Sequence, residues 1–171
     1  MANEWPHVDT VYKAGERESL EAFLDDYRAV IVRKATGLSD ADAGRRLLPT
    51  ETTPGGLVKH LRWVEQNWFQ AVLAQTPADE LPTPPWTDDD PDADFRLEAG
   101  ESLDDEIGAY QRQCVRSQET AARFALDDTA PHRRRGEVSL RWIYLHMIEE
   151  TARHAGHLDI LRELIDGTVG D

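Results

Sequence analysis

Apolar residues recur every three or four positions through most of this chain, which is the spacing that places them on one face of an α-helix. Four long helices are predicted on this basis, over residues 16–37, 53–75, 102–125 and 139–166. The core-facing positions expected on the first and third of them are Leu20, Phe23, Leu24, Tyr27, Ile31, Leu38, Ile107, Tyr110, Cys114, Ser117 and Ala121. A brief connecting helix is expected over residues 39–48, and no segment shows the alternation that is typical of a half-buried strand. The pattern predicts an all-α protein built as a four-helix bundle.

The ends of these helices carry residues that suit helix termini. Ser39, Thr53 and Ser102 stand where a side-chain oxygen can accept a hydrogen bond from the first turn. Pro54 follows at the first helical position of the second long helix. Gly167 stands just past the last helix, where glycine commonly stops a helix. The local sequence and the apolar period therefore agree on where the helices begin and end.

Residues 76–100 differ in composition from the rest of the chain, because they are rich in proline, aspartate and threonine. They are predicted to form a long crossover loop between the second and third long helices, and loops of this length often cover a functional site. Asp90, Asp92 and Asp94 are spaced like calcium ligands, but Phe95 occupies the position that a calcium loop reserves for glycine. A solvated acidic loop is therefore expected.

Acidic residues outnumber basic ones by 33 to 19, which gives the 171-residue chain a formal net charge of −14. Such a chain repels phosphate backbones, so nucleic acid is not expected as a partner. The one basic run, Arg133 to Arg135, is too short for a nucleic-acid-binding stripe and is expected to be a solvated loop before the last helix. The length fits a single domain over residues 1–171.

Cys114 is the only cysteine, so an internal disulfide is not possible. It lies in the apolar stripe of the third long helix and is expected to be a packing residue rather than a nucleophile. The N-terminus shows neither the basic nor the apolar region of a signal peptide, and no stretch approaches the roughly eighteen apolar residues of a membrane span. The sequence therefore predicts a soluble, cytoplasmic protein with no membrane partner.

Two polar residues one turn apart on the last helix, Glu150 and His154, lie within the arc of its apolar residues. A buried carboxylate is unfavourable unless it is paired with a charge or bound to a metal. His60 borders the inward face of the second long helix and could supply a third ligand from across the bundle. Three ligands leave coordination positions open, as in a catalytic site, and this donor set suits zinc, nickel, iron or manganese, of which zinc is expected.

Simpler interpretations of these residues remain open at this point. A histidine on an apolar face can be a hydrogen-bonded core residue, and Glu150 could be paired with Arg153 or Arg62. His157 and His146 lie one turn from the pair on the same side of the last helix, so either could join the metal. His157 is favoured as a group that contacts substrate or shuttles a proton. The combination of several residues, rather than any one of them, favours the metal site.

Three segments carry a family resemblance: residues 53–61 (TPGGLVKHL), residues 90–95 (DPDADF) and residues 149–157 (EETARHAGH), the last followed by LDILR. Together they resemble the DinB-like superfamily, and more closely its actinobacterial branch of mini-circle proteins. The resemblance implies a four-helix bundle of the DinB/YfiT-like type. It also implies a metal held by one histidine from the second helix and two residues one turn apart on the last.

The residues that the resemblance marks as metal ligands are His60, Glu150 and His154. Many members of the superfamily have histidine where Glu150 stands, whereas the mycothiol-dependent maleylpyruvate isomerases resemble this chain in using glutamate there. The resemblance thus implies a metal-dependent transferase or isomerase that acts on a small thiol such as mycothiol and a small electrophile, and often a homodimer. In this hypothesis His157 is the catalytic residue, which orients the thiol or shuttles a proton. A non-catalytic, stress-linked protein that binds a metal or another ligand is the alternative hypothesis.

Overall fold

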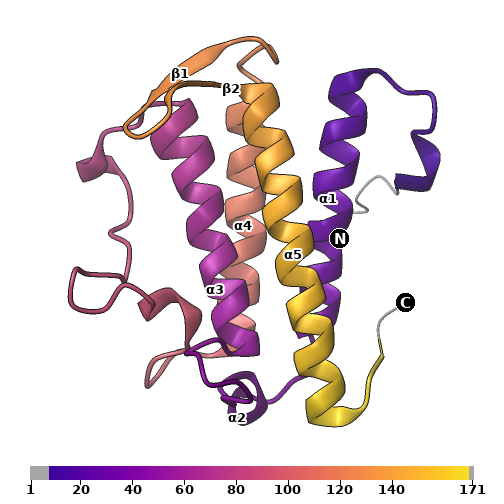
Figure 1. Cartoon of the computed structure of the whole chain (residues 1–171), viewed down its shortest axis with the longest axis vertical. Helices are drawn as coiled ribbons and strands as arrows, with labels where there is room; N and C mark the ends of the chain where they lie inside the picture. Colours follow the sequence, from indigo (N-terminus) through magenta and orange to yellow (C-terminus); the bar gives the residue numbers. More distant parts are fainter. Residues whose placement is uncertain (1–7, 170–171) are drawn as a thin grey trace.

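Long helices make up most of the structure, a computed structural model that describes residues 8–169 (Figure 1). The long elements, which lie side by side, are α1 (Glu16–Ala35), α3 (Pro54–Glu65) with its continuation η2 (Gln66–Leu73), α4 (Leu103–Ala121) and α5 (Leu140–Asp166). The short elements are η1 (Val8–Thr10), α2 (Asp40–Ala43), η3 (Ala78–Glu80), η4 (Ala93–Phe95) and the strands β1 (Thr129–His132) and β2 (Gly136–Ser139). The helical class predicted from the sequence is confirmed. No helix within residues 8–169 is long and apolar enough to cross a bilayer.

Helix termini confirm the predicted caps at Thr53 and Ser102 and the predicted stop at Gly167, whereas α4 ends at Ala121 rather than 125 and α2 covers only Asp40–Ala43 of the predicted residues 39–48. The hydroxyl of Thr53 accepts a hydrogen bond from the backbone N–H of Gly56 at 3.1 Å, and the hydroxyl of Ser102 accepts one from the N–H of Asp105 at 3.2 Å. Gly167 ends α5 in the left-handed conformation, with a φ of 76°. These caps satisfy backbone groups that have no partner inside the helix, so the helix bounds are encoded locally.

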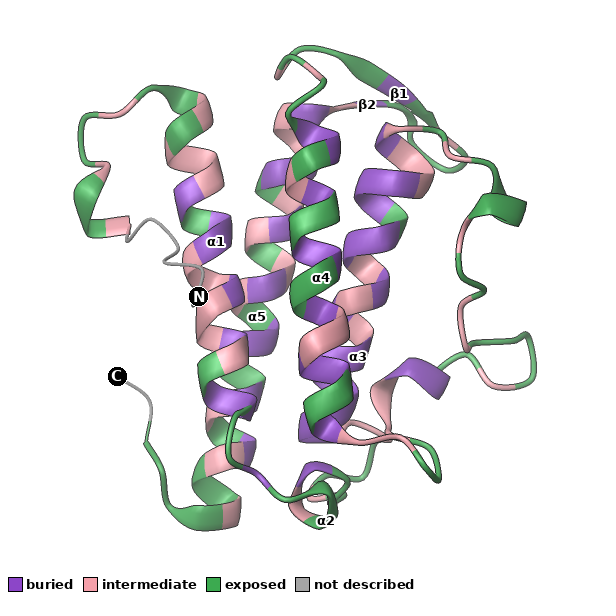
Figure 2. Cartoon of the chain, turned by 180° about the vertical axis from the view of Figure 1, so that it is seen from behind, coloured by how far each residue is buried: buried purple, intermediate pink, exposed green. Residues whose placement is uncertain are grey.

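The core lies between the long helices, whose buried faces turn toward one another (Figure 2). The largest fully buried apolar side chains fall into two clusters: Ile31, Leu57, Leu61, Leu103, Tyr110 and Leu158 in the first, and Leu24, Phe69, Leu140, Ile143 and Met147 in the second. Every core-facing position predicted on the third long helix is buried. The prediction for Phe23 is wrong, because this residue is 46% exposed. It lies about 100° around α1 from Leu24, which takes the inward position.

The helix predicted over residues 53–75 changes type at Glu65, where α3 gives way to the π-helix η2. A π-helical hydrogen bond spans five residues instead of four, so each residue advances by a smaller angle around the axis. Within η2 the three consecutive residues Trp68, Phe69 and Gln70 are all buried. The prediction of one continuous α-helix is wrong beyond Glu65.

Residues 126–138, which the sequence predicted as a polar connection, contain most of a two-stranded antiparallel hairpin (Figure 1). The strands pair in register down to His132 and Gly136, which leaves Arg133–Arg135 as the connecting loop. Gly136 has a φ of 78°, and a left-handed residue in this place closes three-residue hairpin loops. The expectation that the chain has no strand is wrong, because strands of four residues are too short to show a period of two in the sequence.

Candidate metal centre

Two helices bring together the three residues predicted as metal ligands. His60 lies on α3, and Glu150 and His154 lie on one face of α5. The Nε2 atoms of both histidines approach the same carboxylate oxygen, Glu150 Oε1, which lies 3.5 Å from His60 and 3.2 Å from His154. One ligand atom from each residue lies within 4.8 Å of the others. Two imidazole nitrogens and one carboxylate oxygen that converge in this way fit zinc and related divalent ions.

Asp94, which the sequence placed in a solvated acidic loop, is buried behind His60 instead. Its Oδ2 lies 2.8 Å from Nδ1 of His60, and only 4% of the residue is exposed. A carboxylate at this distance accepts the proton of Nδ1, so Nε2 is the ring nitrogen that faces Glu150 and that an ion can take once its proton has left. The expectation of a solvated loop is therefore wrong for Asp94. The sequence contained a signal for this residue, since it belongs to one of the three segments that carry the family resemblance.

Close backbone contacts hold the crossover loop against α3. The ring of Phe95 stacks on the ring of His60 with centroids 4.1 Å apart. The carbonyl oxygen of Phe95 accepts hydrogen bonds from both the N–H and the hydroxyl of Thr53, each at 3.2 Å. Gly56 permits this approach, because a Cβ at this position would lie 1.7 Å from the same carbonyl oxygen. This part of the loop therefore covers His60 and fixes the orientation of its ring.

Histidines and carboxylates balance one another's charge in the site. Burial lowers the pKa of His60, but hydrogen bonds with Asp94 and Glu150 outweigh burial and raise it above its ordinary value of 6.5. Hydrogen bonds from His154 and His60 hold the pKa of Glu150 well below the usual range of a carboxyl group. Glu150 is therefore an anion that can bind a cation. A divalent ion would have to displace the proton that His60 carries.

The alternative ion pairs of Glu150 are only partly present. Arg62 pairs with Glu106 at 2.9 Å instead. Nη1 of Arg153 lies 3.6 Å from Oε2 of Glu150, but the arginine side chain is 53% exposed and also pairs with Glu149. An exposed arginine contributes little, because water screens its charge. The two histidines therefore remain the main partners of Glu150.

The other two histidines of α5 lie at the margin of the site. Nδ1 of His157 lies 3.4 Å from Nδ1 of His154, the ring nitrogen of His154 that does not face Glu150, and His157 is exposed. His146 stacks on Trp142 with ring centroids 5.0 Å apart. Partial desolvation of each ring lowers its pKa, and for His157 the neighbouring positive charges of His154 and Arg153 act in the same direction, which favours neutral rings. His157 can thus orient His154, whereas His146 belongs to an aromatic stack.

An open cavity of about 470 Å³ lies beside His60. Its walls include aromatic rings from α3, from η2 and from the crossover loop, namely Trp63, Trp68, Trp86 and Phe95. Asp94 also lines it, and Arg134 of the hairpin loop contributes to the wall from another part of the chain. A small organic molecule therefore has room next to His60, the candidate ligand that lines this cavity.

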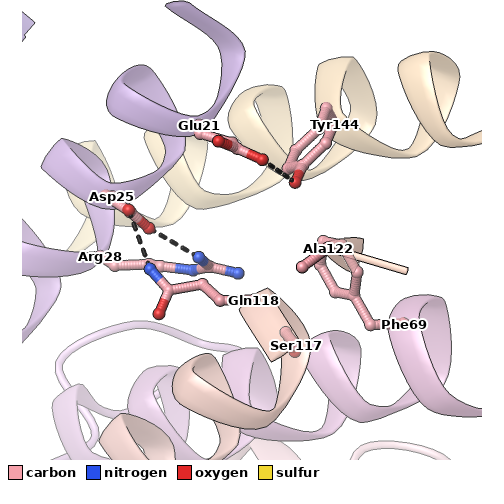
Figure 3. A pocket seen from close by; sticks show the side chains of 8 residues that line it. All are labelled: Glu21, Asp25, Arg28, Phe69, Ser117, Gln118, Ala122 and Tyr144. Atoms are coloured by element: carbon pink, nitrogen blue, oxygen red, sulfur yellow. Dashed lines mark hydrogen bonds and ion pairs between the residues drawn. The ribbon is translucent and has the colours of Figure 1, made fainter. Parts of the chain in front are cut away.

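A second cavity, of about 260 Å³, involves none of the predicted site residues (Figure 3). Arg28 on its wall forms ion pairs of 2.7 Å with both Asp25 and Glu65, and all three are at most 5% exposed. The hydroxyl of Tyr144 donates a hydrogen bond to Glu21 at 2.9 Å. Because these groups satisfy one another, the arrangement is a buried charge network that supports the fold.

The comparisons with known proteins agree with this geometry. A sequence profile of the family described as mycothiol-S-transferase matches residues 19–167. The chain belongs to this mycothiol S-transferase family. The predicted resemblance to the DinB-like superfamily is thereby confirmed. His60, Asp94, Glu150 and His154 all lie within the region that matches the mycothiol S-transferases.

A comparison of this mycothiol S-transferase family member with the curated proteins found no match. Among solved structures, it is similar to one described as the conserved protein of locus from Enterococcus faecalis. The two have a TM-score of 0.70 and 14% sequence identity, and the similarity covers 90% of this chain and 98% of the other. At this identity the likeness concerns the fold alone, and it supports the arrangement of the helices.

Proposed function

We propose that the protein is a metal-dependent transferase or isomerase that brings a small thiol, such as mycothiol, together with a small electrophile. Membership of the mycothiol S-transferase family supports the thiol. The observation that carries the proposal is the convergence of His60, Glu150 and His154 beside an open cavity. Convergent metal-binding groups next to a cavity are the usual setting for chemistry on a small ligand.

His60, Glu150 and His154 would hold the ion, with zinc favoured and nickel, iron and manganese as alternatives. A divalent ion held there would lower the pKa of a small thiol that binds to it, and so would make the thiolate available near neutral pH. Asp94 holds the ring of His60 through Nδ1 and makes Nε2 a stronger donor. Glu150 adds the negative charge that balances the cation.

The single cysteine of the chain is not placed to act as the nucleophile. Cys114 is only 1% exposed inside the core, and burial raises the pKa of its thiol, which disfavours the thiolate. The reacting sulfur would therefore come from the small thiol. His157 is proposed to hold or transfer a proton at the edge of the site, because it is exposed and contacts His154.

The alternative function is a stress-linked protein that binds a metal or a ligand without turnover. A protein that only holds the metal would use the same three side chains and could close the shell around the ion, with no room for a thiol and an electrophile together. The cavity of about 470 Å³ beside His60 favours transfer, because a thiol and an electrophile must both approach the site.

Metal content, measured by mass spectrometry on untagged protein, tests the proposal. We expect about one metal ion per chain in the wild type, as three convergent ligands require. His154→Ala should lose the ion, whereas His146→Ala on the same helix should keep it. The wild type and His146→Ala should consume mycothiol in the presence of a small alkylating electrophile, and His154→Ala should not. A wild type that takes up no zinc, nickel or manganese would overturn the metal site, and a fully loaded protein that consumes no thiol would favour the alternative.

Four further expectations accompany this function. The four long helical segments and the likeness to the Enterococcus faecalis protein support a DinB/YfiT-like four-helix bundle with a crossover loop. A homodimer and a cytoplasmic location stay predictions from the sequence. So does the absence of a nucleic-acid or membrane partner.

A further inference from the structure

The arginine loop of the hairpin lies at one end of the aromatic cavity. Arg134 lines the cavity beside His60 and also an adjoining cavity of about 670 Å³, which its two neighbouring arginines line as well. Asn67 and Trp68 belong to the walls of both cavities. The two cavities therefore form one groove that runs from His60 to the hairpin loop.

Ring contacts hold the hairpin loop in place on both sides of Arg134. The ring of His132 stacks on Trp68, with centroids 5.2 Å apart and planes inclined by 12°. The guanidinium of Arg135 lies 4.9 Å over the ring of Trp142. Arg134 stands between these two anchored residues, and its backbone N–H donates to Nδ1 of His132 at 3.2 Å. The backbone that carries the Arg134 side chain is therefore fixed at the groove.

The charge of this loop contrasts with the rest of the molecule. The chain has a formal net charge of −14, yet three consecutive arginines line the groove. Within the part of the chain that the structure describes, neither Arg133 nor Arg134 forms an ion pair, and both are exposed. A guanidinium offers two parallel N–H donors that match a carboxylate, so an unpaired arginine beside aromatic walls suits an anion with an apolar body.

We propose that the groove binds a molecule with a carboxylate at one end and an apolar or aromatic body. The carboxylate pairs with Arg134, the body lies against Trp63, Trp68 and Trp86, and the far end reaches toward His60. In terms of the proposed function, on which this assignment rests, the molecule is the electrophile. Binding itself uses the arginine and the aromatic walls and requires no metal.

Isothermal titration calorimetry on metal-free protein tests this assignment with trans-cinnamate and trans-cinnamamide, which share a shape and differ in charge. The wild type should bind cinnamate roughly tenfold more tightly than the amide, as a charge-assisted hydrogen bond provides. Arg134→Gln should bring the two affinities together. Arg112→Gln, an exposed residue of α4 that lines neither cavity, should keep the difference. Added salt should weaken the binding of cinnamate only.

The outcomes separate this assignment from the proposed function. Equal affinity for the two probes in the wild type, binding of neither probe, or a preference that survives Arg134→Gln would overturn the carboxylate site. Tighter binding of inorganic phosphate than of cinnamate would assign the loop to phosphate groups and overturn it as well. Because the titrations use metal-free protein, a failure to bind metal would overturn the proposed function and leave these results unchanged.

Discussion

At the scale of single residues, the candidate site depends on the side chains behind His60 as much as on the three ligands. A histidine ring that could rotate freely would present Nε2 to Glu150 for only part of the time. The hydrogen bond of 2.8 Å to Asp94 and the stacking on Phe95 at 4.1 Å remove that freedom. Asp94 should therefore affect metal affinity without touching the metal.

The first prediction concerns this hydrogen bond. Asp94→Asn should lower the affinity for zinc about 10- to 100-fold, because the amide keeps the shape but loses the charge that makes His60 a strong donor. Competition with a chromophoric chelator measures the affinity. Asp92→Asn is the matched control, since Asp92 is exposed and forms no side-chain capping bond. Equal affinity in both variants would mean that Asp94 only packs the loop.

The second prediction concerns pH. In the metal-free protein the pKa of His60 lies above its ordinary value of 6.5, because bonds to Asp94 and Glu150 outweigh burial. The charged ring therefore adds stability that is complete below the unfolded pKa and is lost as the pH rises through the folded pKa. Zinc must displace this proton, so its affinity should fall about tenfold per unit of pH below the folded pKa of His60 and level off above it. Chelator competition across this range would contradict the idea if the affinity stayed constant.

At the scale of elements, the sequence predicted the features that depend on a local pattern of residues. The apolar period and the caps predicted the four long helices, and the four-residue spacing of Glu150 and His154 placed both on one face. The buried position of Asp94 could not be predicted, because it depends on a hydrogen bond with His60, which lies 34 residues away along the chain. The position of the hairpin could not be predicted either, because it depends on the stacking of His132 on Trp68, a residue of a distant helix.

The third prediction tests the contact between the crossover loop and α3. In Gly56→Ala the new Cβ would meet the carbonyl oxygen of Phe95 at 1.7 Å, so the loop must move and carry its contacts with His60 away. Urea unfolding should show a loss of about 1–3 kcal/mol, and zinc affinity should fall as well. Gly156→Ala on α5 is the control, because its Cβ meets nothing within 4 Å. That variant should gain about 0.5–1 kcal/mol and keep its zinc affinity.

At the scale of the whole molecule, the buried charge network ties several helices to α1. Arg28 reaches from α1 to Glu65 at the end of α3, and Gln118 of α4 donates to Asp25 of α1 at 2.9 Å. The hydroxyl of Tyr144 adds a bond from α5 to a carboxylate of α1. Sliding one helix along another would leave a buried charge without its partner. The network therefore favours one register of the helices and keeps α3 and α5, which carry the candidate ligands, in fixed relation.

The fourth prediction removes the centre of this network. Arg28→Met should lower the free energy of unfolding by about 3–5 kcal/mol, because Glu65 is fully buried and would keep an uncompensated charge. Adding Glu65→Met and Asp25→Asn to the same chain should recover most of the loss, since no buried charge then lacks a partner. Urea denaturation followed by tryptophan fluorescence measures both. If the triple variant were as unstable as the single one, the network would act through its specific hydrogen bonds rather than through charge balance. If the triple variant were stable but bound zinc poorly, the charges would contribute to the metal centre by fixing the register of the helices.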